Sequence, residues 1–249
     1  MKSTSLFWAI SVCLTCWYLL AFALRRAILP FPHEVMLCFL YELQGELGIH
    51  VLWSLWRVLL SIALALITAV PFGIALGQLN RLRKLCEPFL YLLYPIPKVV
   101  FVPLLILFFG IGEIPKVLTI YLVLFFQIAV LVRDRTSEIR PELILSVKSL
   151  GAGRRALFRF VYLPAALPAI FTAIRQSTGT AIAVLYLAEL FATRYGLGYY
   201  IYLTGSTLLD YRAMYAGIMA MSLLGLGIYY ALDPIERKVC PWNFLKLTE

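Results

Sequence analysis

Long apolar stretches without a charge limit how this chain can fold more than any other feature of its sequence. The first stretch, residues 5–24, contains 20 residues and no charged side chain. About 20 predominantly apolar residues allow an α-helix to cross the hydrocarbon core of a bilayer. Because an α-helix satisfies its own backbone hydrogen bonds, it is the structure that such stretches adopt in lipid. The sequence therefore predicts an all-α, polytopic membrane protein.

The composition of the chain supports this prediction. Apolar residue types make up 62% of the 249 residues, and charged residues only 14%. Soluble domains have roughly 45–50% apolar and about 25% charged residues, and the mean hydropathy here is +0.89. So few charges do not cover the water-exposed surface of a globule of this length. We therefore expect a single transmembrane domain over residues 1–249 and no large soluble domain.

Six membrane spans are predicted, of which the third is unusual. Pro95, Pro97 and Pro103 interrupt it, and prolines remove backbone donors and kink helices. In lipid, the freed backbone groups must be satisfied by protein or by a water-lined path, so this span is expected to face the protein interior. A polar connector separates the first two spans. The spans are expected at about residues 5–24, 54–79, 89–109, 117–132, 165–190 and 213–232.

The basic residues predict how the chain is oriented. With six spans, 14 of the 22 Lys and Arg residues fall on one side, including Lys2, Lys246 and seven in residues 133–162, whereas five fall on the other. Cytoplasmic loops carry the excess of Lys and Arg, so both termini are expected in the cytoplasm. If residues 5–24 were instead a cleaved signal peptide, five spans and an external N-terminus would remain. Basic and aromatic residues do not interleave as in nucleic-acid-binding proteins, and no nucleic acid is expected as a partner.

Polar side chains inside the spans are candidates for a translocation path, because burying them in lipid is costly. Near helix ends they can instead extend their charged groups to the interface, and small hydroxylated residues can serve close helix packing. In an ion-coupled secondary transporter, Arg57 or Glu189 would be the coupled site. The path candidates are Arg57, Gln127, Arg175, Gln176, Thr178 and Glu189.

Motifs of catalytic or metal-binding sites are not found in the sequence. It contains no GxxxxGK[ST] phosphate loop, no GxSxG, no HExxH and only two histidines. Cys13 and Cys16 form a CxxC, but both lie in an apolar span, where they are interpreted as small membrane residues. We expect no catalytic residue, no metal and no cofactor on this chain, with a membrane enzyme or scaffold as the alternative.

Residues 133–164 are the most charged part of the chain. Apolar residues recur there at helical spacing, and Gly151 is expected to divide the segment into two short helices before Pro164 opens the next span. A basic, amphipathic helix pair between spans is suited to docking a soluble partner. The other interpretation is a helix that lies on anionic lipid.

This loop resembles the EAA loop of permease subunits of binding-protein-dependent ABC importers. Leu150-Gly151-Ala152 matches the glycine of that motif with its neighbours, and Leu163-Pro164 matches its distal end. Leu145-Ser146-Val147 stands where the motif has Glu-Ala-Ala. The resemblance implies that the loop contacts a cytoplasmic ATPase subunit, which binds ATP and Mg²⁺. The residues implied in this coupling are Ser149, Leu150, Gly151, Ala152, Arg154, Arg155, Leu163 and Pro164.

Further matches extend the resemblance over nearly the whole chain. They are Leu29-Pro30-Phe31-Pro32, the run from Pro95 to Glu113, Ala188-Glu189-Leu190, and Tyr195-Gly196-Leu197-Gly198. This combination is similar to the family branch that handles taurine, alkanesulfonates, nitrate and pyrimidine vitamin precursors. It implies a type I ABC importer permease fold, a homodimer in the bacterial plasma (inner) membrane surrounded by lipid, and an external solute-binding protein. The substrate within this set stays open.

Overall fold

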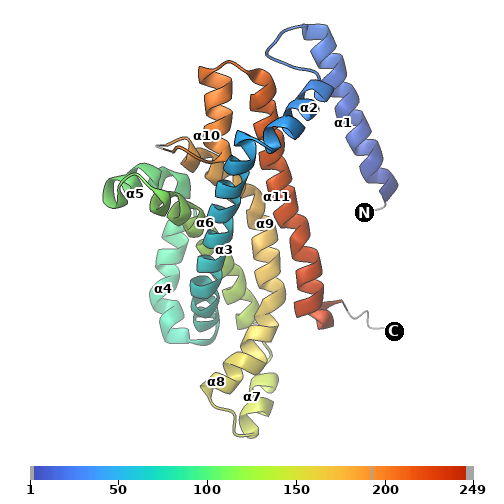
Figure 1. Ribbon diagram of the computed structural model, residues 1–249. Coiled ribbons are helices and arrows are strands. Elements are labelled where there is room, and N and C mark those ends of the chain that lie inside the picture. The colour runs from blue at the N-terminus through green and yellow to red at the C-terminus, as the bar shows by residue number, and fades with distance from the viewer. Residues whose placement is uncertain (1–2, 192, 245–249) are drawn as a thin grey trace. The chain divides into compact units, whose positions relative to one another are not determined.

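The computed structural model describes residues 3–191 and 193–244, and every regular element in that part of the chain is helical (Figure 1). The all-α prediction is therefore confirmed. Five of the described helices are long and apolar enough to cross a membrane, or six if one bent helix pair forms a single span. Lys2 and Lys246, which entered the charge distribution, lie outside the described residues.

The helices group into two compact units, Met1–Leu55 with Glu189–Leu224, and Trp56–Ala188 with Gly225–Glu249. Helices α3, α9 and α11 each contribute residues to both units. The elements are α1 (Ser3–Leu24), α2 (Pro32–Leu43), α3 (Glu46–Gln78), α4 (Asn80–Leu93), η1 (Lys98–Phe101), α5 (Val102–Phe109), α6 (Glu113–Ser137), α7 (Pro141–Ser149), α8 (Arg154–Leu157), η2 (Phe158–Tyr162), α9 (Leu163–Glu189), α10 (Leu197–Tyr202), η3 (Leu203–Thr207), α11 (Tyr211–Val239) and η4 (Pro241–Asn243).

Several helices are longer than the apolar stretches that predicted them. Helix α3 begins at Glu46, where the sequence suggested a connector up to about residue 53, and α4 begins at Asn80 rather than near residue 89. Glu, Lys and Arg are good helix formers, so a helix continues beyond its apolar part when polar residues follow. Apolar patterning therefore locates the spans but does not mark where the helices end.

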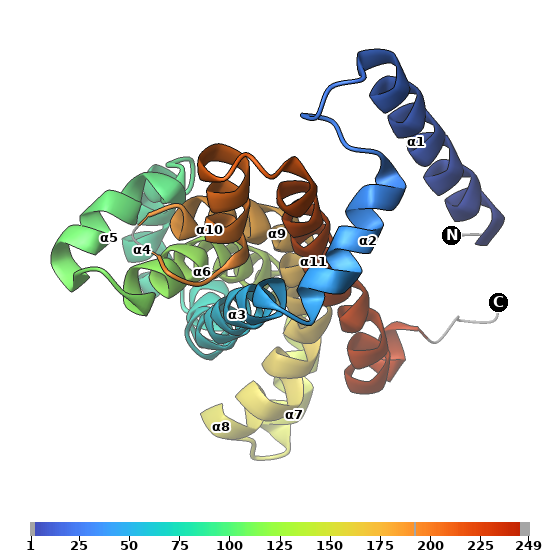
Figure 2. The same cartoon turned by 45° about the horizontal axis from the view of Figure 1, so that its top comes forward.

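The second unit has its core between α3, α6 and α9, around fully buried residues such as Ile120, Ile128 and Leu185. Gly73 allows α3 to approach α6 closely, because a Cβ at this position would stand 2.8 Å from the carbonyl oxygen of Ala129. Small residues permit such close backbone approach in membrane helices. At one end of this unit, α7 and α8 lie side by side as a pair of short helices (Figures 1 and 2).

The proline-rich third stretch bends by 87° between α4 and the η1–α5 segment. The ammonium group of Lys98 stabilises this bend, since its Nζ donates to the carbonyl oxygens of Leu93 at 2.6 Å, Ile96 at 2.7 Å and Tyr94 at 3.2 Å. Lys98 is 8% exposed. A buried cation thus satisfies carbonyls that the interrupted helix leaves free, which is the compensation that lipid demands.

In the first unit, α2 is positioned by contacts at its start. Pro32 opens the helix, and the carboxylate of Glu34 accepts a hydrogen bond from the Phe31 backbone N–H at 3.0 Å. Proline and an acceptor at a helix N-terminus replace the hydrogen bonds that the first turn lacks. Trp17 of α1 donates to the carbonyl oxygen of Pro30 at 3.1 Å. Helix α1 nevertheless leaves side chains such as Phe7 and Trp8 more than two-thirds exposed.

Candidate functional site

A buried carboxylate organises the segment after α9 in the first unit. Glu189 is fully buried and accepts hydrogen bonds from the Ser54 hydroxyl at 2.8 and 3.0 Å and from the Gly198 backbone N–H at 2.7 Å. The Ser54 hydroxyl oxygen also accepts from the backbone N–H of Leu197 at 2.8 Å. The two halves of the predicted Ala-Glu…Gly-Leu-Gly pattern therefore meet, and Glu189 anchors the start of α10.

His50 completes this network. Its ring Nδ1 accepts a hydrogen bond from the Gly196 backbone N–H at 2.9 Å, and the residue is 5% exposed. Gly196 has φ of +138°, a conformation that glycine adopts without steric cost. His50 and Ser54 were missed by the sequence analysis, although His50 is one of two histidines in the chain. Their helical spacing of four residues was the available signal, since it places both side chains on one face of α3.

Arg57 lies within the second unit and pairs with the first turn of α6. Its Nε and Nη2 donate to the two carboxylate oxygens of Glu113 at 2.5 and 2.8 Å, and Arg57 is 1% exposed. Lys116 Nζ contacts the same carboxylate at 3.2 Å. This bidentate arrangement is among the stronger charge-assisted contacts in proteins. Arg57 therefore does not lie at a lipid-exposed helix end but joins two spans.

Arg175 pairs with acidic residues near the end of α11. Its Nη2 donates to Asp233 at 2.7 Å and to Glu236 at 2.8 Å. The three charged groups come from two different helices, so they connect α9 to α11. Gln176, the next residue, is exposed, and its side chain makes no hydrogen bond within the described part of the chain.

Gln127 and Thr178 occupy different surroundings. The hydroxyl of Ser177 hydrogen-bonds to the amide oxygen of Gln127, and Thr178 donates back to the carbonyl oxygen of Ile174 at 2.8 Å. Gln127 also lines a cavity of about 320 Å³ with Lys98 and Thr180. Of the predicted path residues, Gln127 is thus the one that borders this cavity, together with Lys98 and Thr180, which were not among the candidates.

The predicted coupling residues lie on α7, α8 and the turn between them. Gly151 has φ of +84°, and Leu150 beside it is 86% exposed. Arg154 and Arg155 are also exposed, and Leu163 and Pro164 are half-buried where α9 begins. The hydroxyl of Ser149 donates to the carbonyl oxygen of Leu145 at 3.0 Å, within α7. The glycine thus separates two short helices as predicted, and an apolar side chain stands exposed at the turn.

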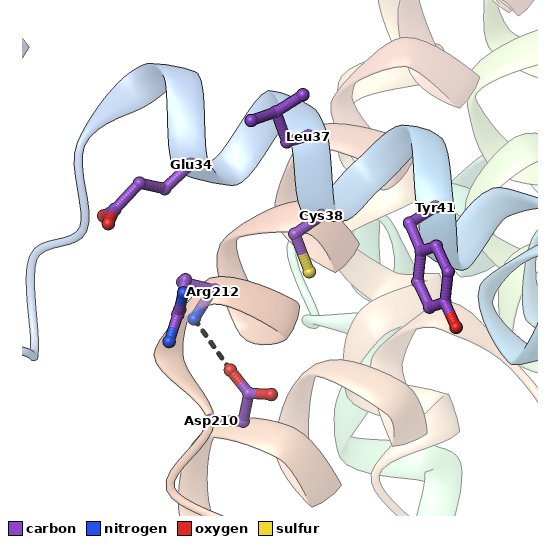
Figure 3. Close-up of a pocket in the computed structure, with 6 residues that line it drawn as sticks. All are labelled: Glu34, Leu37, Cys38, Tyr41, Asp210 and Arg212. Atoms are coloured by element: carbon purple, nitrogen blue, oxygen red, sulfur yellow. Dashed lines mark hydrogen bonds between the residues drawn. The ribbon is translucent and has the colours of Figure 1, made fainter.

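A further pocket of about 370 Å³ lies between α2 and the start of α11 (Figure 3). Asp210 accepts hydrogen bonds from the backbone N–H groups of Arg212 at 3.1 Å and Ala213 at 3.2 Å, and so caps α11. Cys38 points toward Asp210 from α2 (Figure 3). Burial and the nearby carboxylates of Asp210 and Glu42 raise the pKa of this thiol. Among the described residues, no cluster of His, Cys, Asp and Glu is arranged to hold a metal ion.

Comparisons with known proteins agree on one family. The profile of the family described as "Binding-protein-dependent transport system inner membrane component" matches residues 69–240. The taurine transport system permease protein TauC of Escherichia coli (strain K12) is 31% identical over 94% of this chain and 88% of its own length. The putative aliphatic sulfonates transport permease protein SsuC of Bacillus subtilis (strain 168) is 30% identical over 87% of this chain and 78% of its own.

Among solved structures, the chain is similar to one from the inward-facing MetNI methionine ABC transporter. The TM-score is 0.66 at 23% sequence identity, over 79% of this chain and 97% of the other. This likeness shows the fold, which is that of an ABC importer permease.

Proposed function

This chain belongs to the family of binding-protein-dependent transport system inner membrane components, and from that premise we propose that it carries a small organosulfonate across the membrane. The chain is the permease component of an ABC importer. The observation that carries the substrate class is the similarity to the taurine permease over 94% of the chain. The similarity to the aliphatic sulfonates permease supports the same class.

The substrate class is tested by competition. Cells that express this permease with its ATPase and binding protein should take up labelled taurine, and unlabelled alkanesulfonates in tenfold excess should suppress that uptake. Nitrate and pyrimidine vitamin precursors should leave it unchanged. Suppression by nitrate or a pyrimidine alone, with no effect of sulfonates, would assign the permease to another branch of the family.

The exposed turn at residues 149–155 supports its role as the contact for the ATPase. Leu150 in the turn and Arg155 of α8 are both exposed, and they offer an apolar and a charged anchor to a soluble partner. The ATPase holds ATP and Mg²⁺, and its closure is transmitted through the pair as a rigid-body movement. Leu163 and Pro164 join the pair to α9, which carries four of the predicted path residues: Arg175, Gln176, Thr178 and Glu189.

The translocation path forms between two copies of the chain in the bacterial inner membrane, with both termini in the cytoplasm and an external binding protein delivering the substrate. Support for the second copy comes from Gln176 on α9, because a polar side chain that is exposed on a membrane span is costly to leave in lipid. We retain the uncharged residues Gln127, Gln176 and Thr178 as path candidates, because Glu189 is hydrogen-bonded to Ser54 and Gly198. The ion pairs of Arg57 and Arg175 favour a role in holding the spans together.

A further inference from the structure

A large cavity separates the end of α3 from the helix pair α7–α8 in the second unit. Its volume is about 930 Å³, at the upper end of the range of ligand pockets in proteins. Pro71, Ile74 and Ala75 of α3 line one side, and Leu157 and Phe158 line the other. Of the residues implied in coupling, Gly151, Ala152 and Arg154 also line the cavity, whereas Leu150 and Arg155 do not.

The lining of the cavity changes from apolar to polar along α3. At 1.5 Å rise per residue, Pro71 stands roughly 10 Å along α3 from Gln78, the last residue of that helix. The apolar lining from Pro71 to Ala75 therefore lies toward the middle of α3, and the end at Gln78 lies near the polar residues that also line the cavity.

Two cations stand at the shallow end. Lys148 of α7 and Arg154 of α8 line the cavity from the two short helices, and both are exposed. In the part of the chain that the structure describes, neither forms an ion pair with an acidic side chain. Basic pockets between membrane helices on the cytoplasmic side bind the headgroups of anionic lipids. Tyr162 also lines the cavity, and tyrosine is enriched at the membrane interface.

We propose that this cavity binds one anionic phospholipid per permease, with an acyl chain against Pro71 and Ile74 and the phosphate between Lys148 and Arg154. The lipid fills the space beneath the helix pair and fixes the pair against α3. This inference needs the permease family and the orientation of the loop, but it does not depend on the sulfonate substrate.

Lipid retention by the purified complex of permease and ATPase tests the proposal. Native mass spectrometry after detergent washing, with phosphatidylglycerol or phosphatidylcholine supplied at equal concentration, should show one tightly retained phosphatidylglycerol per permease. A Lys148→Ala/Arg154→Ala double variant should bind it on the order of 30-fold more weakly, because each cation near an anionic lipid strengthens binding about fivefold. Arg140→Ala, which removes an exposed cation of the same loop outside the cavity, should retain it as the natural chain does.

A second variant separates headgroup binding from acyl-chain binding. Ala75→Phe keeps both cations but fills the apolar part, and should also lose the lipid. Glycerol phosphate, which lacks an acyl chain, should not displace it. Equal retention of both lipids, retention unchanged in the double variant, displacement by glycerol phosphate, or loss of the lipid whenever the ATPase is bound would overturn the proposal. The last result would assign the cavity to the ATPase contact instead.

Discussion

At the scale of single residues, buried charges hold backbone segments of this protein in place. The carboxylate of Glu189 accepts hydrogen bonds from Ser54 and Gly198 without exposure to solvent. A Glu189→Gln variant replaces one carboxylate oxygen, which accepts hydrogen bonds, by an amide NH₂ group, which donates. This group would then face the Ser54 hydroxyl or the Gly198 backbone N–H, which are themselves donors. Hydrogen bonds to a charged group contribute about 1.5–3 kcal/mol, so we expect a loss of that size in the free energy of unfolding of the purified permease.

The matched control for Glu189 is Glu46→Gln, which changes an exposed glutamate in the first turn of α3. Its effect should stay below about 1 kcal/mol, the size of a charge–helix-dipole interaction. If both variants unfold at the same denaturant concentration, Glu189 does not anchor the 196–198 segment.

Cys38 provides a residue-scale test of orientation and of pH dependence. With the N-terminus in the cytoplasm, as proposed, helix α2 follows the first span and lies on the external side of the membrane. An impermeant maleimide added to intact cells should therefore label a variant with Cys38 as its only cysteine. Because burial and Asp210 raise the thiol pKa, the reactive thiolate stays scarce beyond an ordinary thiol pKa of about 8.5. The labelling rate should therefore rise about tenfold per pH unit from pH 7 and still increase above pH 8.5.

The comparison for Cys38 is a variant that keeps only Cys86, which is partly exposed and lies in α4 on the proposed cytoplasmic side. It should remain unlabelled in intact cells. Labelling of Cys86 but not Cys38 would reverse the proposed orientation.

At the scale of elements, the turn between α7 and α8 depends on the backbone of Gly151. Its φ of +84° disfavours other residues, although a Cβ there would meet no atom within 4 Å. Gly151→Val should strain the turn by roughly 1–2 kcal/mol and redirect α8. We expect ATP hydrolysis by the assembled complex to continue while coupled uptake falls at least about tenfold, a change equivalent to roughly 1.4 kcal/mol.

Two substitutions make the Gly151 test specific. Gly151→Asn should retain most uptake, because asparagine tolerates a positive φ, and Gly153→Val should strain nothing, since Gly153 has φ of −76°. Unchanged coupled uptake in Gly151→Val would remove this turn from the coupling mechanism.

The bend between α4 and α5 is a second element-scale test. Lys98→Met leaves the carbonyl oxygens of Leu93, Tyr94 and Ile96 without their ammonium donor. Unsatisfied buried acceptors cost about 1–3 kcal/mol each, so the variant should lose at least about 2 kcal/mol of stability in detergent unfolding. Lys238→Met, at an exposed position in the last turn of α11, should lose little. An equal loss in both would mean that Lys98 does not stabilise the bend.

At the scale of the whole molecule, the sequence predicted the type of fold and the position of a helix break. It did not predict which charged side chains form ion pairs with each other. Apolar stretches predicted the all-α membrane fold, and Gly151 predicted the break between two short helices, because both depend on local properties. The partners of Arg57 and Arg175 are 56 to 61 residues away along the chain. Residue type and spacing within one span carry no information about such partners.

The same limit applies to the buried network of the first unit. His50 and Ser54 meet Gly196 and Leu197 across more than 140 residues of sequence. Glu189 and the Gly-Leu-Gly segment each match a family motif, but neither match indicates that the carboxylate accepts a hydrogen bond from that backbone. Only the fold brings these groups together.

Uptake into proteoliposomes tests the central claim, that the chain is the permease of an ATP-driven importer. The permease, its ATPase and the binding protein are reconstituted, with ATP and Mg²⁺ supplied on the ATPase side and labelled taurine with the binding protein on the other. We predict taurine accumulation that requires hydrolysable ATP and the binding protein, and that is unaffected when sodium and proton gradients are collapsed. Accumulation that follows an ion gradient in the absence of ATP would contradict the account.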